Sequence, residues 1–130
     1  MTKILFLDDD EERHIAFKKK LERAGHNVNQ MINDGELHFV WDAPSCINKF
    51  KENKYDEVHL DHDLGMQFYV DVNLENTGSA VCRFIAQELA PEHYPKKAII
   101  HSWNHYGALN MQSLLQSVKI PVVLQRFSYK

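Results

Sequence analysis

The stretch VHLDHDLG, residues 58–65, decides the fold of this 130-residue chain. A short apolar run stops here at two aspartates with a histidine between them, and a glycine follows. This pattern predicts a buried strand over 57–60 that ends in a polar, tightly turning loop. Strands of an open parallel sheet carry their functional groups just past their carboxyl ends, which is where Asp61, His62 and Asp63 fall.

Two other apolar runs end in the same way. Residues 3–7 run into three aspartates at 8–10, and residues 98–100 run into a histidine and a serine at 101–102. If these strands lie side by side and point the same way, their polar ends share one edge of one sheet. We therefore expect a single functional pocket at that edge.

Strand-like and helix-like segments alternate along the rest of the chain. Further strands are predicted over 37–41 and 122–124. Helical spacing of apolar residues marks four segments: 11–24, a segment opening at Asp42 or Ser45, one opening at Thr77-Gly78 and closed by Pro91, and 104–117. The polar stretch 27–35 predicts an inserted loop or small hairpin. Five alternations predict one α/β domain over 1–130, a doubly wound, five-stranded parallel sheet with helices on both faces.

Composition narrows the class of protein. With 44% hydrophobic and 25% charged residues the chain is typical of globular domains, and its net charge of -3 predicts no broad nucleic-acid footprint. No apolar stretch reaches membrane-spanning length, so we expect no membrane partner. Cys46 and Cys82 stand alone within apparently helical segments, which favours buried thiols over a disulfide and predicts a cytoplasmic location.

Neighbouring carboxylates follow the first predicted strand. Asp10, with Glu11, fits the start of a helix, where free N–H groups favour negative charge. Asp8 and Asp9 need another explanation, because adjacent carboxylates raise each other's pKa unless a cation compensates. Asp61 adds a third carboxylate from the neighbouring strand. Three carboxylates suit a hard divalent ion, so Asp8, Asp9 and Asp61 predict a Mg²⁺ site.

Histidines near these acids leave a second choice of ion open. His62 and His101, together with the aspartates, form a mixed ligand set that also suits Mn²⁺ or Zn²⁺. No cysteine lies in the cluster, which favours Mg²⁺. Because imidazole titrates near neutral pH, the same two histidines are also candidate general acids or bases.

Four features resemble the response-regulator receiver fold: LDDD at 7–10, LD at 60–61, Gly78 ahead of a helix, and Ser102 after the fourth strand. The resemblance spans nearly the whole chain and implies the flavodoxin-like strand order 2-1-3-4-5. It also implies that Asp8 and Asp9 hold Mg²⁺ and that Asp61 accepts a phosphoryl group. Ser102 would then contact the phosphoryl oxygens.

Other features depart from ordinary receivers. The fifth strand of that family ends in lysine and proline, whereas residues 124–127 read LQRF, with Arg126 as the available cation. A second set of motifs is similar to the cyclic-phosphate-processing receiver domain: Asp8-Asp9 with Arg13-His14, LDHDLG at 60–65, and HSWN at 101–104 with Gly107 and Asn110-Met111. This resemblance implies a role on cyclic phosphate ends of RNA or of related nucleotides.

Phosphoester chemistry needs charge neutralisation, positioning and proton transfer, and the predicted pocket offers all three. The candidate catalytic residues are Asp61, His62 and His101. The candidate substrate-binding residues are Arg13, His14, Asp63, Ser102 and Asn104. Aromatic side chains that could stack on a base are Phe68, Tyr69, Trp103 and Tyr106.

Three functions remain open on the sequence. The first is a metal-dependent phosphohydrolase or phosphodiesterase that acts on a nucleotide or RNA phosphate, with cyclic phosphates among the candidates. The second is a signalling receiver with Asp61 as phosphoacceptor, and the third is a module that binds a nucleotide or a partner protein without chemistry. The long segment 65–77 is a candidate lid over the pocket.

Overall fold

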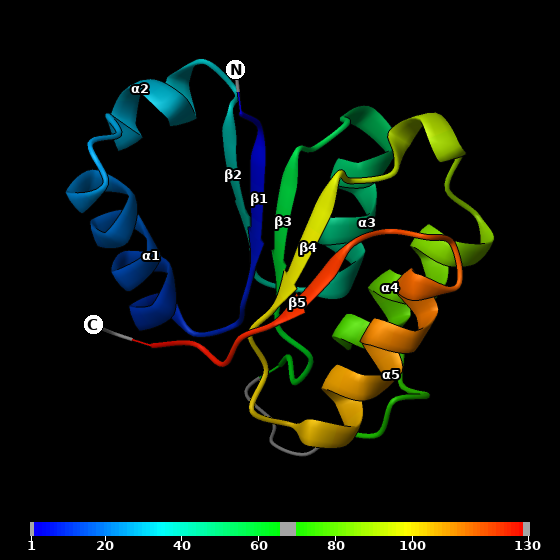
Figure 1. Ribbon diagram of the computed structural model, residues 1–130. Helices are drawn as coiled ribbons and strands as arrows, with labels where there is room; N and C mark the ends of the chain where they lie inside the picture. The colour runs from blue at the N-terminus through cyan, green and yellow to red at the C-terminus, as the bar shows by residue number, and fades with distance from the viewer. Residues whose placement is uncertain (1, 66–69, 129–130) are drawn as a thin grey trace.

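A computed structural model describes residues 2–65 and 70–128. Five parallel strands form one sheet in the order β2-β1-β3-β4-β5 (Figure 1). The strands are β1 (Ile4–Leu7), β2 (Leu37–Val40), β3 (Glu57–Leu60), β4 (Lys97–Ile100) and β5 (Val122–Leu124). This arrangement confirms the predicted fold class and strand order.

Helices cover the sheet on both sides, as Figure 1 shows. On one side lie α1 (Glu11–Arg23) and α2 (Val28–Asn33); on the other lie α3 (Ala43–Glu52), α4 (Gly78–Gln87) and α5 (His105–Gln116). A short 3-10 turn, Pro91–His93, precedes β4. After β5 the chain turns back along the carboxyl ends of the strands toward α1.

The helix α2 corrects the expectation of a loop or hairpin over 27–35. Asn27 caps it, with its side chain accepting a hydrogen bond from the backbone N–H of Gln30 at 3.1 Å. Val28 and Met31, three residues apart, are both buried against the α1 side of the sheet. A helix of six residues is too short to show a repeating apolar pattern, so its polar residues suggested a turn instead.

Alternation along the strands decides which side chains meet. On β1, Leu5 and Leu7 belong to the core under α3, α4 and α5, whereas Ile4 and Phe6 belong to the smaller core under α1 and α2. Because successive side chains of a strand point to opposite faces, the residue after Leu7 points to the α1 side. The same parity applies to the residues that follow β3 and β4.

The strands β1, β3 and β4 also end in step. Leu7 pairs with Leu60, and Leu60 pairs with Ile100. Backbone hydrogen bonds extend the ladder by one residue, from the Asp61 N–H to the Leu7 carbonyl at 3.1 Å and from the His101 N–H to the Leu60 carbonyl at 3.0 Å. Asp8, Asp61 and His101 therefore lie side by side at the carboxyl edge, on the α1 side of the sheet.

Two of the composition-based expectations concern residues that the structure describes. Cys46 and Cys82 are free, buried thiols, as expected. Within 2–65 and 70–128, no helix has both the length and the apolar character needed to cross a membrane.

Candidate metal and phosphate site

Asp8, Asp61 and His101 form one buried group. One potential ligand atom from each lies within 4.8 Å of the others. Nε2 of His101 lies 2.8 Å from Oδ2 of Asp8, within hydrogen-bond distance. The three residues come from three different strands, so the in-step strand ends assemble the site.

Aromatic rings hold His101 in place. Its imidazole stacks on the Phe6 ring, with centroids 5.1 Å apart and planes 6° from parallel. The Phe127 ring packs against it edge-on at 5.7 Å. Since these contacts fix the plane of the ring, Nε2 stays directed at Asp8. Burial lowers the pKa of His101 despite the contact with Asp8, which favours the neutral imidazole that metals bind.

Arg13 lies against the two acids from the first turn of α1. Its Nη1 is 3.3 Å from Oδ2 of Asp8 and 3.6 Å from Oδ2 of Asp61. Its Nε is 3.9 Å from Oδ2 of Asp10. Asp10 caps the helix by accepting a hydrogen bond from the Glu12 N–H at 2.9 Å, which fixes the turn that carries the arginine. The prediction placed Arg13 near phosphate; the structure places its guanidinium on the acids.

The two carboxyls respond in opposite directions to their surroundings. Burial and the negative charge of Asp8 raise the pKa of Asp61 to about 8, while Arg13 opposes this rise. Burial also acts to raise the pKa of Asp8, but the hydrogen bond and charge of His101, the Asp10 N–H and Arg13 together lower it. At neutral pH, without a metal, Asp8 therefore carries the charge and Asp61 holds a proton.

These residues fit a divalent cation. Two buried carboxylates with one imidazole are a ligand set for Mg²⁺ or Mn²⁺, and Zn²⁺ also accepts such a mixture. Asp9 is not among the three residues of this group, and its role as a metal ligand stays a prediction. Its charge still contributes to the raised pKa of Asp61. The sequence suggested His101 both as a general acid or base and as a ligand for Mn²⁺ or Zn²⁺; what it could not show is that this ring directly contacts Asp8.

His14 lies behind Asp8. Its Nε2 is 2.7 Å from the Asp8 backbone carbonyl oxygen, to which it can donate. The ring is fully buried and stacks on Trp41, with centroids 4.2 Å apart. Burial lowers the pKa of His14. A buried ring bonded to the backbone suits positioning of Asp8, whereas contact of His14 with substrate stays a prediction.

His62 points to the opposite face of the sheet from Asp61, as alternation requires. Its Nδ1 lies 2.9 Å from Oδ1 of Asp63, and its Nε2 lies 2.9 Å from Oγ of Ser79 on α4. Asn110 on α5 donates to the same Oγ at 2.8 Å. Ser79 carried no recognisable signal in the sequence, whereas Asn110 belonged to the motifs that resemble the cyclic-phosphate-processing receiver domain, without an assigned role.

The order Asp63–His62–Ser79 matches an acid–base–nucleophile relay in its hydrogen bonds. Both His62 and Ser79 are completely buried, however, and both nitrogens of the ring already have partners. A serine with no exposed surface cannot meet a substrate atom. This network therefore fits a role in positioning, and proton transfer by His62 stays a prediction.

Two glycines allow this close packing. A Cβ at Gly107 would overlap the His62 ring, and a Cβ at Gly78 would overlap the Asp61 carbonyl oxygen and the Met111 side chain. Gly78 also donates its N–H to the His62 carbonyl at 3.0 Å. The helices α4 and α5 thus approach the Asp61 turn at their first residues.

Asn104 ties the remaining predicted residues together. Its Oδ1 accepts from the Gly107 N–H at 3.0 Å and so caps α5, while its Nδ2 donates to Oδ1 of Asp63 at 2.9 Å. Ser102 accepts the Asn104 N–H at 3.0 Å. Asp63 also accepts the Val70 N–H at 3.1 Å, which anchors one end of the described part of segment 65–77. Contacts of these residues with phosphate stay predictions.

Exposed aromatic rings lie close to the site in sequence. Trp103 is 54% exposed and Tyr106 is 82% exposed. The guanidinium of Arg126 lies 4.9 Å from the centre of the Trp103 ring. Phe68 and Tyr69, which were also predicted to stack on a base, lie outside the described residues.

Fold and site together define a receiver-like α/β domain with a buried acidic cluster at the ends of β1 and β3. The family model for the cyclic-phosphate processing receiver domain matches residues 3–117. The chain belongs to that family. No curated protein matches the sequence.

Solved structures similar to this chain include three response regulators. TrrA from Thermotoga maritima, in complex with Mg²⁺ and BeF, has 19% identity and a TM-score of 0.64, over 100% of this chain and 91% of TrrA. Mn²⁺-bound Rcp1 has 14% identity and a TM-score of 0.62, over 96% of this chain and 81% of Rcp1. RcsB from Salmonella enterica serovar Typhimurium, bound to promoter DNA, has 13% identity and a TM-score of 0.60, over 98% of this chain and 89% of RcsB. These similarities establish the receiver fold.

Proposed function

We propose that this domain binds a divalent metal, most simply Mg²⁺ or Mn²⁺, at Asp8, Asp61 and His101, and hydrolyses a phosphoester of a nucleotide or RNA end, with a cyclic phosphate as the favoured substrate. The observation that carries the proposal is the buried group of two carboxylates and one imidazole, with Arg13 beside it. The family name adds support for the cyclic phosphate. TrrA and Rcp1 hold Mg²⁺ and Mn²⁺ on the same fold, which supports the choice of ion.

The side chains of the site can divide the work of hydrolysis. A bound divalent ion would supply positive charge for the phosphate oxygens and lower the pKa of a water molecule. Arg13 can stabilise the charge that builds on the phosphoryl oxygens. His101, in contact with Asp8 through its Nε2, would serve as the third ligand of that ion, and solvent at the site would carry the proton from the attacking water to the leaving oxygen. Water then forms the new P–O bond, and the ribose oxygen leaves with a proton.

The test is turnover of cyclic nucleotides. The purified protein is incubated with Mn²⁺ or Mg²⁺ and a panel of 2′,3′-cyclic nucleotides, and products are followed by ³¹P NMR. We expect hydrolysis that requires the metal and is lost in D61N and in D8N. D34N, which removes one exposed carboxylate at the end of α2, is the matched control and should remain active. Absence of turnover across the panel would refute hydrolysis.

A second candidate function is phosphoryl acceptance by Asp61. The observation in its favour is the position of Asp61, directly after β3 and beside Asp8, on a receiver fold. The observation against it is that Arg126, the nearest cation to the end of β5 in sequence, lies over Trp103. Lysine and arginine differ in the way they bind oxygen ligands, so the replacement predicts weak acceptance.

Acceptance has its own readout. After treatment with acetyl phosphate and Mg²⁺, intact-mass spectrometry would show the addition of one phosphoryl group to the wild type but not to D61N. A stable phosphoryl adduct together with no cyclic-nucleotide turnover would make this second function the correct one.

A further inference from the structure

Arg13 occupies the position of a counter-ion in the acidic cluster. Its Nη1 approaches Oδ2 of Asp8 at 3.3 Å and Oδ2 of Asp61 at 3.6 Å, so one nitrogen serves both acids. Both carboxyls are nearly or completely buried, whereas the Arg13 side chain keeps 20% of its surface exposed. A buried pair of acids requires such compensation, by a cation or by a proton.

A divalent ion held by Asp8 and Asp61 would draw on the same two carboxylates. Guanidinium and metal would then be two cations at one pair of carboxylates, and their repulsion at such short range is strong inside a protein. The arginine and the ion therefore compete. Binding of one weakens binding of the other, and the linkage is reciprocal.

Another carboxylate, that of Asp10, can hold the guanidinium when it leaves Asp8 and Asp61. The Arg13 Nε already lies 3.9 Å from Oδ2 of Asp10, whose side chain is 39% exposed to solvent. A small rotation of the long side chain toward Asp10 would keep one carboxylate partner and bring the planar guanidinium group toward solvent. Arginine binds phosphate through two parallel hydrogen bonds, which makes it well suited to hold an incoming phosphoryl group there.

We propose that Arg13 is a resident counter-ion which a divalent metal displaces from Asp8 and Asp61, and that the displaced guanidinium then binds the phosphate of the substrate. Metal and phosphate would thereby bind in a coupled manner, since phosphate meets a free guanidinium only when the metal is present. The inference rests on the metal site of the proposed function but does not require hydrolysis.

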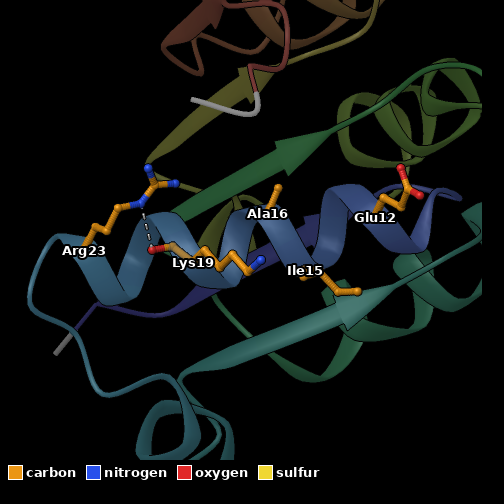
Figure 2. A pocket seen from close by; sticks show the side chains of 5 residues that line it. All are labelled: Glu12, Ile15, Ala16, Lys19 and Arg23. Atoms are coloured by element: carbon orange, nitrogen blue, oxygen red, sulfur yellow. Dashed lines mark hydrogen bonds between the residues drawn. The ribbon is translucent and has the colours of Figure 1, made fainter.

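Metal affinity tests the first half. Isothermal titration with Mn²⁺ alone compares the wild type with R13Q, R13K and R23Q. Arg23 is the matched control, because it lies at the far end of α1 and donates within its own helix, to the Lys19 carbonyl (Figure 2). We expect R13Q to bind Mn²⁺ about tenfold more tightly than the wild type. R13K, which keeps the charge, and R23Q should remain close to it.

Phosphate affinity tests the second half. Titration with inorganic phosphate, followed by ³¹P NMR, is carried out with and without saturating Mn²⁺. In the wild type we expect phosphate to bind about tenfold more tightly when Mn²⁺ is present. In R13Q this gain should largely disappear, even though the metal itself binds better. Far-ultraviolet circular dichroism of each metal-free variant confirms that it is folded.

Each outcome of the Mn²⁺ titrations either supports or overturns displacement of Arg13 by the metal. Tighter Mn²⁺ binding by R13Q, or binding by R13Q where the wild type shows none, supports displacement. Equal or weaker binding by R13Q than by R23Q overturns it, and so does the absence of Mn²⁺ binding in both proteins. Hydrolysis is measured separately, so a protein that shows the coupling but no turnover would refute the proposed function and leave this inference standing.

Discussion

At the scale of single residues, the two aspartates illustrate how position sets chemistry. Asp8 and Asp61 directly follow neighbouring strands and point to the same face of the sheet, yet it is Asp8 that lies within hydrogen-bond distance of the His101 imidazole. The pKa of Asp8 is consequently lowered, and that of Asp61 is raised to about 8. An acid whose pKa is raised in the folded state destabilises the fold as it ionises, since the unfolded chain loses that proton more readily.

Replacing Asp61 should therefore stabilise the metal-free protein at alkaline pH. In the wild type, stability falls as pH rises from the ordinary value of 3.8 toward about 8, because folding must hold a proton that the unfolded chain releases. D61N has no such proton. We expect D61N to exceed the wild type by about 1 to 3 kcal/mol at alkaline pH and by less in acid.

Urea denaturation in the presence of a chelator, at a series of pH values, measures this difference. D34N removes an exposed carboxylate and serves as the control. An advantage of D61N that shrinks as pH rises would contradict the assigned direction of the Asp61 pKa.

The contact of Gly107 with the His62 ring makes a second residue-level prediction. G107A introduces a Cβ that overlaps the ring, and overpacking of this kind typically costs about 1 to 3 kcal/mol. Alanine is the better helix former, so propensity alone would predict the opposite sign. S113A, on an exposed position of α5, is the control for propensity.

A double-mutant cycle identifies the cause. In an H62A background the ring is gone, and G107A should then cost little or become stabilising. Additive effects of the two substitutions on the urea midpoint would show that the ring is not what the glycine accommodates.

At the scale of elements, two asparagines cap helices in very different surroundings. Asn27 caps α2 at the surface, whereas Asn104 caps α5 while buried and also donates to Asp63. The exposed cap contributes one hydrogen bond to a short helix. The buried cap joins α5 to the turn that follows β3, so its loss would remove hydrogen bonds from both the Gly107 N–H and Asp63.

N104A should therefore cost more than N27A. Loss of an exposed cap costs about 1 kcal/mol, so that is the expected effect of N27A. N104A also removes a side-chain donor to the half-buried Asp63, which keeps its contacts with His62 and the Val70 N–H, and we expect about 2 to 4 kcal/mol in total. Urea denaturation of both variants gives the comparison; equal losses would mean that the side-chain amide of Asn104 contributes nothing beyond capping.

The elements also show how far sequence reasoning reaches. Continuous apolar runs such as 4–7 and well-spaced helices such as α5 were predictable, because a buried strand or an amphipathic helix repeats its pattern. The helix α2 was not, because six residues hold too little of the pattern. Within the site, strand ends placed Asp8, Asp61 and His101 at one edge. The direction of the Arg13 side chain depends on tertiary packing.

At the scale of the whole molecule, the two faces of the sheet are covered unequally. Three helices pack on one face, and α1 and α2 share the other with the segment that follows β5 (Figure 1). Phe127 in that segment packs against Phe6 and His101, and the Lys20 ammonium lies 4.5 Å from the centre of its ring. The segment therefore supports the site as well as the core.

Removing the Phe127 ring should lower both the stability of the fold and the affinity of the site for metal. F127A should lower stability by about 1 to 3 kcal/mol, less than for a fully buried phenylalanine because the ring is only half-buried. It should also weaken Mn²⁺ binding, because His101 loses one of the rings that fix its plane. A conservative control is F127L, and unchanged metal affinity in F127A would show that Phe6 alone orients the imidazole.

The level ending of β1, β3 and β4 has a consequence for redesign. Each strand delivers one side chain to the group formed by Asp8, Asp61 and His101, so position 101 can be exchanged by itself. We expect an aspartate at position 101 to give an all-oxygen ligand set suited to alkaline-earth ions, whereas the native imidazole favours borderline transition metals. A single substitution is therefore expected to change which ion this scaffold prefers.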